Sequence, residues 1–236
     1  MFGCRLHTAI DSLLDLALYL LAGLARLRMG ELDSAAAWFA RAQRDTTEGA
    51  GVFASYLPPA MTQLHLERGR PAEARKSLAL LPSGTLVRRA NRGWFTSWTR
   101  YLEGDVRGAQ EMLEDSLREL KGDGPRPPPA LAMPFVTAAE WRFATGDVRT
   151  ADSLARLGRD AAAVDALALE RSAYAGRAEF VRARALAALG AIPEARRTAE
   201  RAAVAMANGY GPRNARTLRA IAFRDSLASA HPPAHH

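Results

Sequence analysis

Small side chains recur at fixed distances from five glycines that are spread along the chain. The residue five positions after each of these glycines is always alanine, and the residue seven positions before it is always small. Four of the five residues that follow a glycine by twelve positions are small as well. The glycines are Gly30, Gly69, Gly104, Gly146 and Gly190. This self-similarity predicts a chain of five related units.

Each unit is expected to be a hairpin of two antiparallel helices. A glycine in the left-handed conformation ends the first helix, and Pro71 and Pro193 suit the first turn of the second helix, which needs no N–H there. Small residues on both sides of the turn let the two helices cross closely. The predicted helix pairs span 9–29 and 32–47, 52–68 and 71–82, 86–103 and 106–121, 131–145 and 148–163, and 167–189 and 193–208.

With these positions the chain resembles the tetratricopeptide repeat family. The first unit matches the family best, at Tyr19, Gly23, Gly30, Ala35, Phe39 and Ala42. The glycines are 39, 35, 42 and 44 residues apart, whereas the common family period is about 34. The longer periods resemble the kinesin-light-chain type of repeat, and Gly211-Pro212 stands where that type carries a Gly-Pro pair. Arg213 and Asn214 depart from the residues that usually follow that pair.

The expected fold is an all-α superhelix, or solenoid, of about five antiparallel hairpins. A last helix over 213–230 would cap the open end, as solenoids require for solubility. We expect one repeat domain over residues 9–230, with a loop at 122–130 because Pro127–Pro129 cannot continue a helix. Residues 1–8 and 231–236 are expected to be frayed or disordered.

Composition agrees with helix and raises a second hypothesis about partners. Alanine is abundant while valine and isoleucine are sparse, which favours helix over strand. The net charge is +7, and all but two of the 32 basic residues are arginine. Such a surface could bind nucleic acid. The longest basic runs are pairs such as Arg88-Arg89, which favours charges dispersed over solvated helix faces.

No constellation for catalysis, a cofactor or a metal is apparent. Cys4 is the only cysteine, and the five histidines lack metal-ligand spacing in the predicted repeats. Phosphate-binding glycine loops and nucleophile motifs are missing. The most apolar stretch, 13–27, is interrupted by Asp15 and Arg26 and is too short to span a bilayer. We therefore expect a cytoplasmic protein that is not an enzyme.

One aromatic stripe is a candidate binding site. Trp94, Trp98 and Tyr101 lie at i, i+4 and i+7 in the first helix of the third unit. Equal distances from the later glycines select polar and aromatic residues in the fourth and fifth units. The resulting candidate partner-binding residues are Trp94, Trp98, Tyr101, Glu140, Phe143, Phe180 and Arg184.

Two interpretations of this stripe stay open. In the tetratricopeptide family the first helices line a concave groove that holds peptides or partner helices, so the resemblance implies a groove site. Aromatic and arginine side chains are strong interface anchors, and Glu140 and Arg184 would fix the ends of a polar ligand. However, the family's bulky core positions lie one residue earlier than these aromatics. A turn shifted by one residue would place Trp94 and Tyr101 in the core, and Arg100 supports that shift because buried arginine is rare.

These observations lead to two hypotheses about function. The first is a scaffold that binds a protein, as a peptide or a helix, in the concave groove of a tetratricopeptide-like solenoid. The alternative is a helical repeat protein that binds nucleic acid through its arginine-rich surface. The second predicts an affinity that falls steeply with salt, because phosphate contacts release counterions.

Overall fold

The described part of the chain is all helical. A computed structural model describes residues 2–44, 55–81 and 84–229, with side chains from Leu14 onward. Within those ranges there are eleven α-helices, two short 3₁₀-helices and no strand. The chain divides into two compact units, the first ending at Ala109 and the second beginning at Gln110. The all-α prediction is thus confirmed for the described residues.

The first unit packs helices that follow one another in sequence. It contains α1 (Phe2–Met29), α2 (Leu32–Arg44), α4 (Leu57–Glu67), α5 (Pro71–Ala79), α6 (Leu86–Leu102) and the first turn of α7 (Val106–Lys121). α1 packs on α2, α2 on α4, α4 on α5, and α5 on α6. Leucines of α1 and α4 form a core around the fully buried ring of Phe39.

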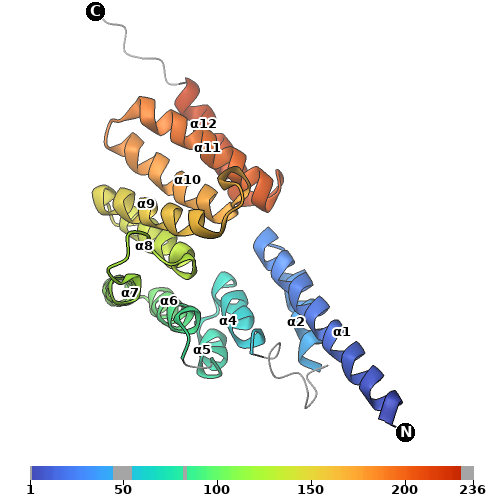
Figure 1. The fold of residues 1–236 in the computed structure, drawn as a ribbon. Coiled ribbons are helices and arrows are strands. Elements are labelled where there is room, and N and C mark those ends of the chain that lie inside the picture. Colours follow the sequence, from blue (N-terminus) through green and yellow to red (C-terminus); the bar gives the residue numbers. More distant parts are fainter. Residues whose placement is uncertain (1, 45–54, 82–83, 230–236) are drawn as a thin grey trace, which may run out of the picture. The chain divides into compact units, whose positions relative to one another are not determined.

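The second unit repeats this arrangement with smaller side chains. It contains the rest of α7, η1 (Pro129–Leu131), α8 (Ala132–Ala144), α9 (Val148–Asp165), η2 (Leu169–Arg171), α10 (Ala173–Ala188), α11 (Ile192–Tyr210) and α12 (Ala215–Ser229). Each helix from α8 to α12 packs on the next one along the chain (Figure 1). Ala139, Ala155 and Val181 form one of several core clusters, so the helices meet through short side chains.

All five predicted turn glycines end a helix in the left-handed conformation. Their φ angles lie between 67° and 94°. In the third unit, for example, the Gly104 N–H donates to the Tyr101 carbonyl at 3.1 Å, and the Asp105 N–H donates to the Arg100 carbonyl at 3.1 Å. The same two bonds recur after the other four helices. This pair is the Schellman motif, which satisfies carbonyls at the helix end.

The small residues lie where helices cross, as predicted. The alanines five positions after the glycines are all fully buried, namely Ala35, Ala74, Ala109, Ala151 and Ala195. Gly23 shows how close the crossing of α1 and α2 is, because a Cβ there would lie 2.4 Å from a ring carbon of Phe39. Any side chain larger than hydrogen would require Phe39 to move.

The arginines near the turns are not buried. Arg100, four positions before its glycine, reaches across the turn and pairs with Asp105, directly after that glycine. Arg26 pairs in the same way with Glu31 at 2.6 Å. These surface ion pairs explain why arginine is tolerated four residues before the glycine. Arg100 therefore lies outside the core, as the interpretation with the turn shifted by one residue requires.

Helix starts differ from the predictions at three places. α1 begins at Phe2, so the expected frayed segment 1–8 is helical from that residue, since no proline interrupts the sequence there. α4 begins at Leu57 and not at 52, because Pro58 and Pro59 fit only its first turn. α10 begins at Ala173 and not at 167, because the Ser172 side chain caps it by accepting a hydrogen bond from the Ala175 N–H.

Other boundaries agree more closely or lie outside the described residues. Residues 122–128 are non-helical, within the loop predicted at 122–130, whose last two residues belong to η1. The predicted capping helix corresponds to α12, which packs on α11. Positions 45–47, 52–54, 82 and 230 of the predicted helices, and the predicted tail 231–236, are outside the described ranges.

Candidate functional site

The predicted stripe falls into two groups, of which the first belongs to the first unit. Trp94 of α6 is only 5% exposed. Its ring stacks on Phe95, with centroids 4.8 Å apart, and on Trp98, with centroids 5.7 Å apart. Trp98 and Tyr101 are half-buried. The core interpretation therefore describes Trp94, while Trp98 and Tyr101 retain some accessible surface.

The second group assembles around Arg184 in the second unit. The Arg184 guanidinium lies over the Phe143 ring, 4.2 Å from its centroid, and 5.7 Å from the centroid of Phe180. Phe180 meets Phe223 of α12 edge-on, with centroids 5.9 Å apart. We call Phe143, Phe180, Arg184 and Phe223 the Arg184 cluster. Its residues come from α8, α10 and α12: Phe143 and Phe180 contact the cation, and Phe223 contacts Phe180.

Glu140 is held by a neighbour of this cluster. Both of its carboxylate oxygens accept hydrogen bonds from Nη2 of Arg177 on α10, at 2.7 and 2.8 Å. Arg177 is well covered, with 13% of its side chain exposed, whereas Glu140 retains 36%. Partly buried ion pairs of this kind cancel each other's charge locally. Glu140 therefore compensates Arg177 directly and acts on Arg184 only at longer range.

Arg184 itself is not paired with a carboxylate. It lies against two aromatic rings and makes no hydrogen bond or ion pair to a described residue. Burial lowers the pKa of Arg184, the charge of Glu140 raises it, and the charge of Arg219 lowers it further. Arginine remains protonated throughout the ordinary pH range. The lowered pKa therefore describes a cation that is partly desolvated and under-compensated.

A second arginine extends the positive charge toward α12. Arg219 is exposed and has neither a hydrogen bond nor an ion pair to a described residue. It lies near enough for its charge to act on Arg184. Sequence reasoning missed Arg219 and Phe223 because α12 lacks the repeated glycine signature. Their i, i+4 spacing on the last predicted helix was the available signal.

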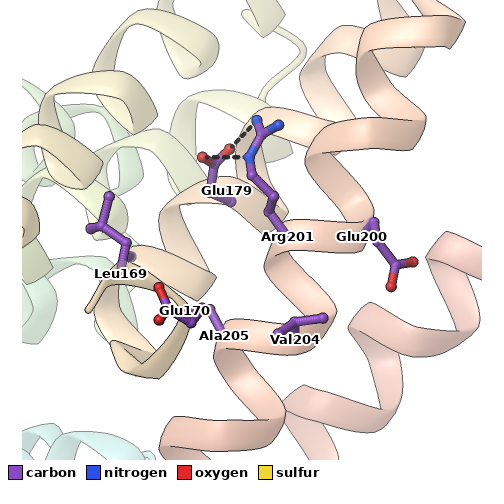
Figure 2. A pocket seen from close by; sticks show the side chains of 8 residues that line it. Leu169, Glu170, Glu179, Glu200, Arg201, Val204 and Ala205 are labelled. Carbon is purple, nitrogen blue, oxygen red and sulfur yellow. Dashed lines mark hydrogen bonds and ion pairs between the residues drawn. The ribbon is translucent and has the colours of Figure 1, made fainter.

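A separate cavity of about 240 Å³ lies between η2, α10 and α11 (Figure 2). It is lined by Leu169, Glu170, Ala175, Glu179, Glu200, Arg201, Val204 and Ala205. Glu179 is 4% exposed and accepts hydrogen bonds from Nε and Nη2 of Arg201, at 3.2 and 3.3 Å. Arg159 approaches the same carboxylate at 2.9 Å. Two guanidinium groups thus hold the Glu179 carboxylate in place, so its oxygens are already engaged within the protein.

Further features bear on the class of site. No group of three or more His, Cys, Asp or Glu side chains in the described residues could hold a metal ion. Among the same residues, no helix combines the length and the apolar character needed to cross a bilayer. Comparison with protein-family models, curated proteins and solved structures finds no match to this chain.

Proposed function

We propose that this protein is a non-catalytic scaffold that binds a segment of another protein, as a peptide or a helix, on the face of the second unit that carries the Arg184 cluster. The proposal includes a solenoid of the tetratricopeptide type, with the first helices of its hairpins lining a concave groove. Support for this architecture comes from the five glycine turns and from the small residues at the helix crossings. Both features recur at the positions where the sequence resembles that family.

The Arg184 cluster is the observation that carries the proposal. Helices α8 and α10, the first helices of two successive predicted hairpins, contribute Phe143, Phe180 and Arg184 to it. Arginine and large aromatic residues dominate the binding energy of many interfaces, because they combine wide contact area with directional donors. A half-buried arginine is also already ordered by its ring contacts, so a partner would not have to immobilise it.

Nucleic-acid binding is less well supported by the pattern of ion pairs. Many arginines of the described residues contact carboxylates within the protein. Arg182, for example, donates to Asp152 at 3.2 Å and to Glu194 at 2.6 Å. Counterion release requires arginines that reach phosphates, and internally paired arginines would first have to leave their carboxylates. The pairing therefore favours a protein partner.

The experiment that tests the proposal is affinity capture from a lysate of the source organism, with and without nuclease. Wild-type protein is compared with the double variant Phe143→Ala/Arg184→Gln and with Arg197→Gln, a control at an exposed arginine of α11. We expect one or two proteins to be enriched in both nuclease arms, retained by the control and lost by the double variant. Direct titration of the purified partner then gives the affinity of each variant.

Two results would contradict the proposal. Enrichment that disappears with nuclease would favour nucleic acid over protein as the partner. Equal capture by wild type and the double variant would show that the Arg184 cluster is not the binding site. Circular dichroism of the double variant separates loss of binding from loss of fold, because the helical signal at 222 nm reports the fold independently of any partner.

A further inference from the structure

The guanidinium of Arg184 carries the hydrogen-bond donors of this cluster. A guanidinium carries five N–H donors in a planar fork, and in this protein its central carbon lies over the Phe143 ring, 4.2 Å from the centroid. Aromatic rings stabilise the positive charge in part, by cation–π attraction, but they do not accept the hydrogen bonds that the N–H groups donate in the guanidinium plane. The N–H donors of Arg184 therefore have no acceptor among the described residues.

The surroundings of Arg184 add positive charge. Arg219 adds a second cation from α12, and its charge acts on Arg184. The nearby carboxylate that could neutralise them, Glu140, is bonded through both oxygens to Arg177. Arg184 and Arg219, from two helices, thus share a region in which the carboxylate of Glu140 is already bonded to Arg177.

We propose that Arg184 and Arg219 form a carboxylate-binding site, which receives an acidic side chain or the C-terminal carboxylate of the protein partner. This inference rests on the proposed scaffold function and specifies the chemistry of its ligand. The fork of Arg184 donates two parallel hydrogen bonds to the carboxylate oxygens, the geometry that arginine forms best. Arg219 contributes a longer-range attraction across the exposed side.

A carboxylate fits this site better than a nucleic-acid phosphate. Binding of single-stranded nucleic acid combines basic groups with open aromatic faces on which bases stack. Here Arg184 covers Phe143, and Phe180 already contacts Arg184 and the edge of Phe223. A single carboxylate needs no open aromatic face, so it avoids this conflict.

The test is an NMR titration of the arginine Nε–Hε signals in the full chain, at constant ionic strength. Three probes are used: N-acetylglutamic acid α-amide for a side-chain carboxylate, N-acetylalanine for a C-terminal carboxylate, and inorganic phosphate. Sodium chloride is the reference. The Arg184 signal is assigned by its disappearance in Arg184→Gln, and Arg219→Gln tests the second cation at an exposed position that leaves the fold intact.

We expect the Arg184 signal to shift and saturate with at least one carboxylate probe, and the tighter of the two identifies the source of the carboxylate. Arg219→Gln should weaken that binding about fivefold, the scale of one partly screened charge. A shift no larger than with chloride would overturn the inference, as would phosphate binding more tightly than both carboxylates. A flat titration combined with loss of capture by the double variant would leave the scaffold proposal standing and remove the carboxylate site alone.

Discussion

The replacement Gly23→Ala tests the close crossing of α1 and α2 most directly. Two opposing effects can be estimated from the structure. Alanine in the middle of a helix is more favourable than glycine by about 1 kcal/mol. Against this, the new Cβ would lie 2.4 and 2.5 Å from two ring carbons of Phe39. Because Phe39 is fully buried, its ring cannot swing into solvent, and overpacking of this kind costs about 1–3 kcal/mol.

Because these two effects partly offset each other, the net change in the free energy of unfolding is small. A double-mutant cycle with Phe39→Leu therefore provides the sharper measurement. Leucine lacks the ring atoms that collide with the new methyl group. In the Phe39→Leu background, Gly23→Ala should therefore stabilise the first unit by up to about 1 kcal/mol, through helix propensity alone. The cost of Phe39→Leu itself cancels in the cycle. The expected coupling energy between the two positions is about 1–3 kcal/mol.

Hydrogen exchange of peptides from α1 and α2, followed by mass spectrometry across a urea series, measures the stability of this hairpin separately from the second unit. The four proteins of the cycle are compared at equal urea concentrations. Additive effects of the two substitutions would refute the reasoning, because they would mean that Gly23 and Phe39 do not compete for the same space. A stabilising Gly23→Ala in the wild-type background would do so as well.

Three further predictions concern other parts of the chain. Ala151→Leu places a large side chain at a fully buried crossing and should lower the stability of the second unit by about 1–3 kcal/mol, measured by calorimetry; an unchanged thermal midpoint would contradict the crossing. Glu179→Gln should cost about 1–3 kcal/mol, because two arginines lose a charged acceptor, whereas Glu200→Gln at the exposed rim of the same cavity should change the urea midpoint very little. Burial lowers the pKa of His65 below its usual 6.5, so the unfolded chain binds a proton more readily than the folded protein, and the first unit should lose stability as the pH falls through 6.5. His65→Gln should therefore reduce the difference between the urea midpoints measured at about pH 7.5 and about pH 5.5. An equal difference in the wild type and the variant would show that His65 is not the source of this pH dependence.

The turns and crossings could be predicted because their causes are local in sequence. A glycine at positive φ is required wherever a Schellman turn ends a helix, and Gly104 shows both of the bonds that define it. Ala151 is small because two helices cross closely at its position, and this crossing recurs at a constant distance from each turn. The predicted starts of α4 and α10 were wrong because single residues decide them: Pro58 lies in the first turn of α4, and Ser172 caps α10. The repeat signature contains neither residue.

The candidate site could be predicted only in part, because side-chain partners depend on contacts across helices. Equal distances from the turn glycines selected Phe143 and Arg184, which do lie together. The same distances also selected Trp94, whose side chain is buried. The partner of Glu140 and the contribution of Arg219 come from positions outside the stripe. The i, i+4 spacing of Arg219 and Phe223 marks one face of α12, but a spacing along one helix does not reveal which side chains of other helices that face meets.

Packing between successive helices within each unit has a consequence for folding kinetics. The stabilising contacts join residues that are close in sequence, and each turn is closed by hydrogen bonds over three to five residues. Chains with such short-range contacts close few large loops, so they fold fast, in microseconds to milliseconds. A single hairpin cannot bury its apolar face alone, so during synthesis the first hairpins would become stable once their neighbours have also left the ribosome. Later hairpins would then add to this folded block one after another, and a pulling force applied at one terminus should remove them in steps.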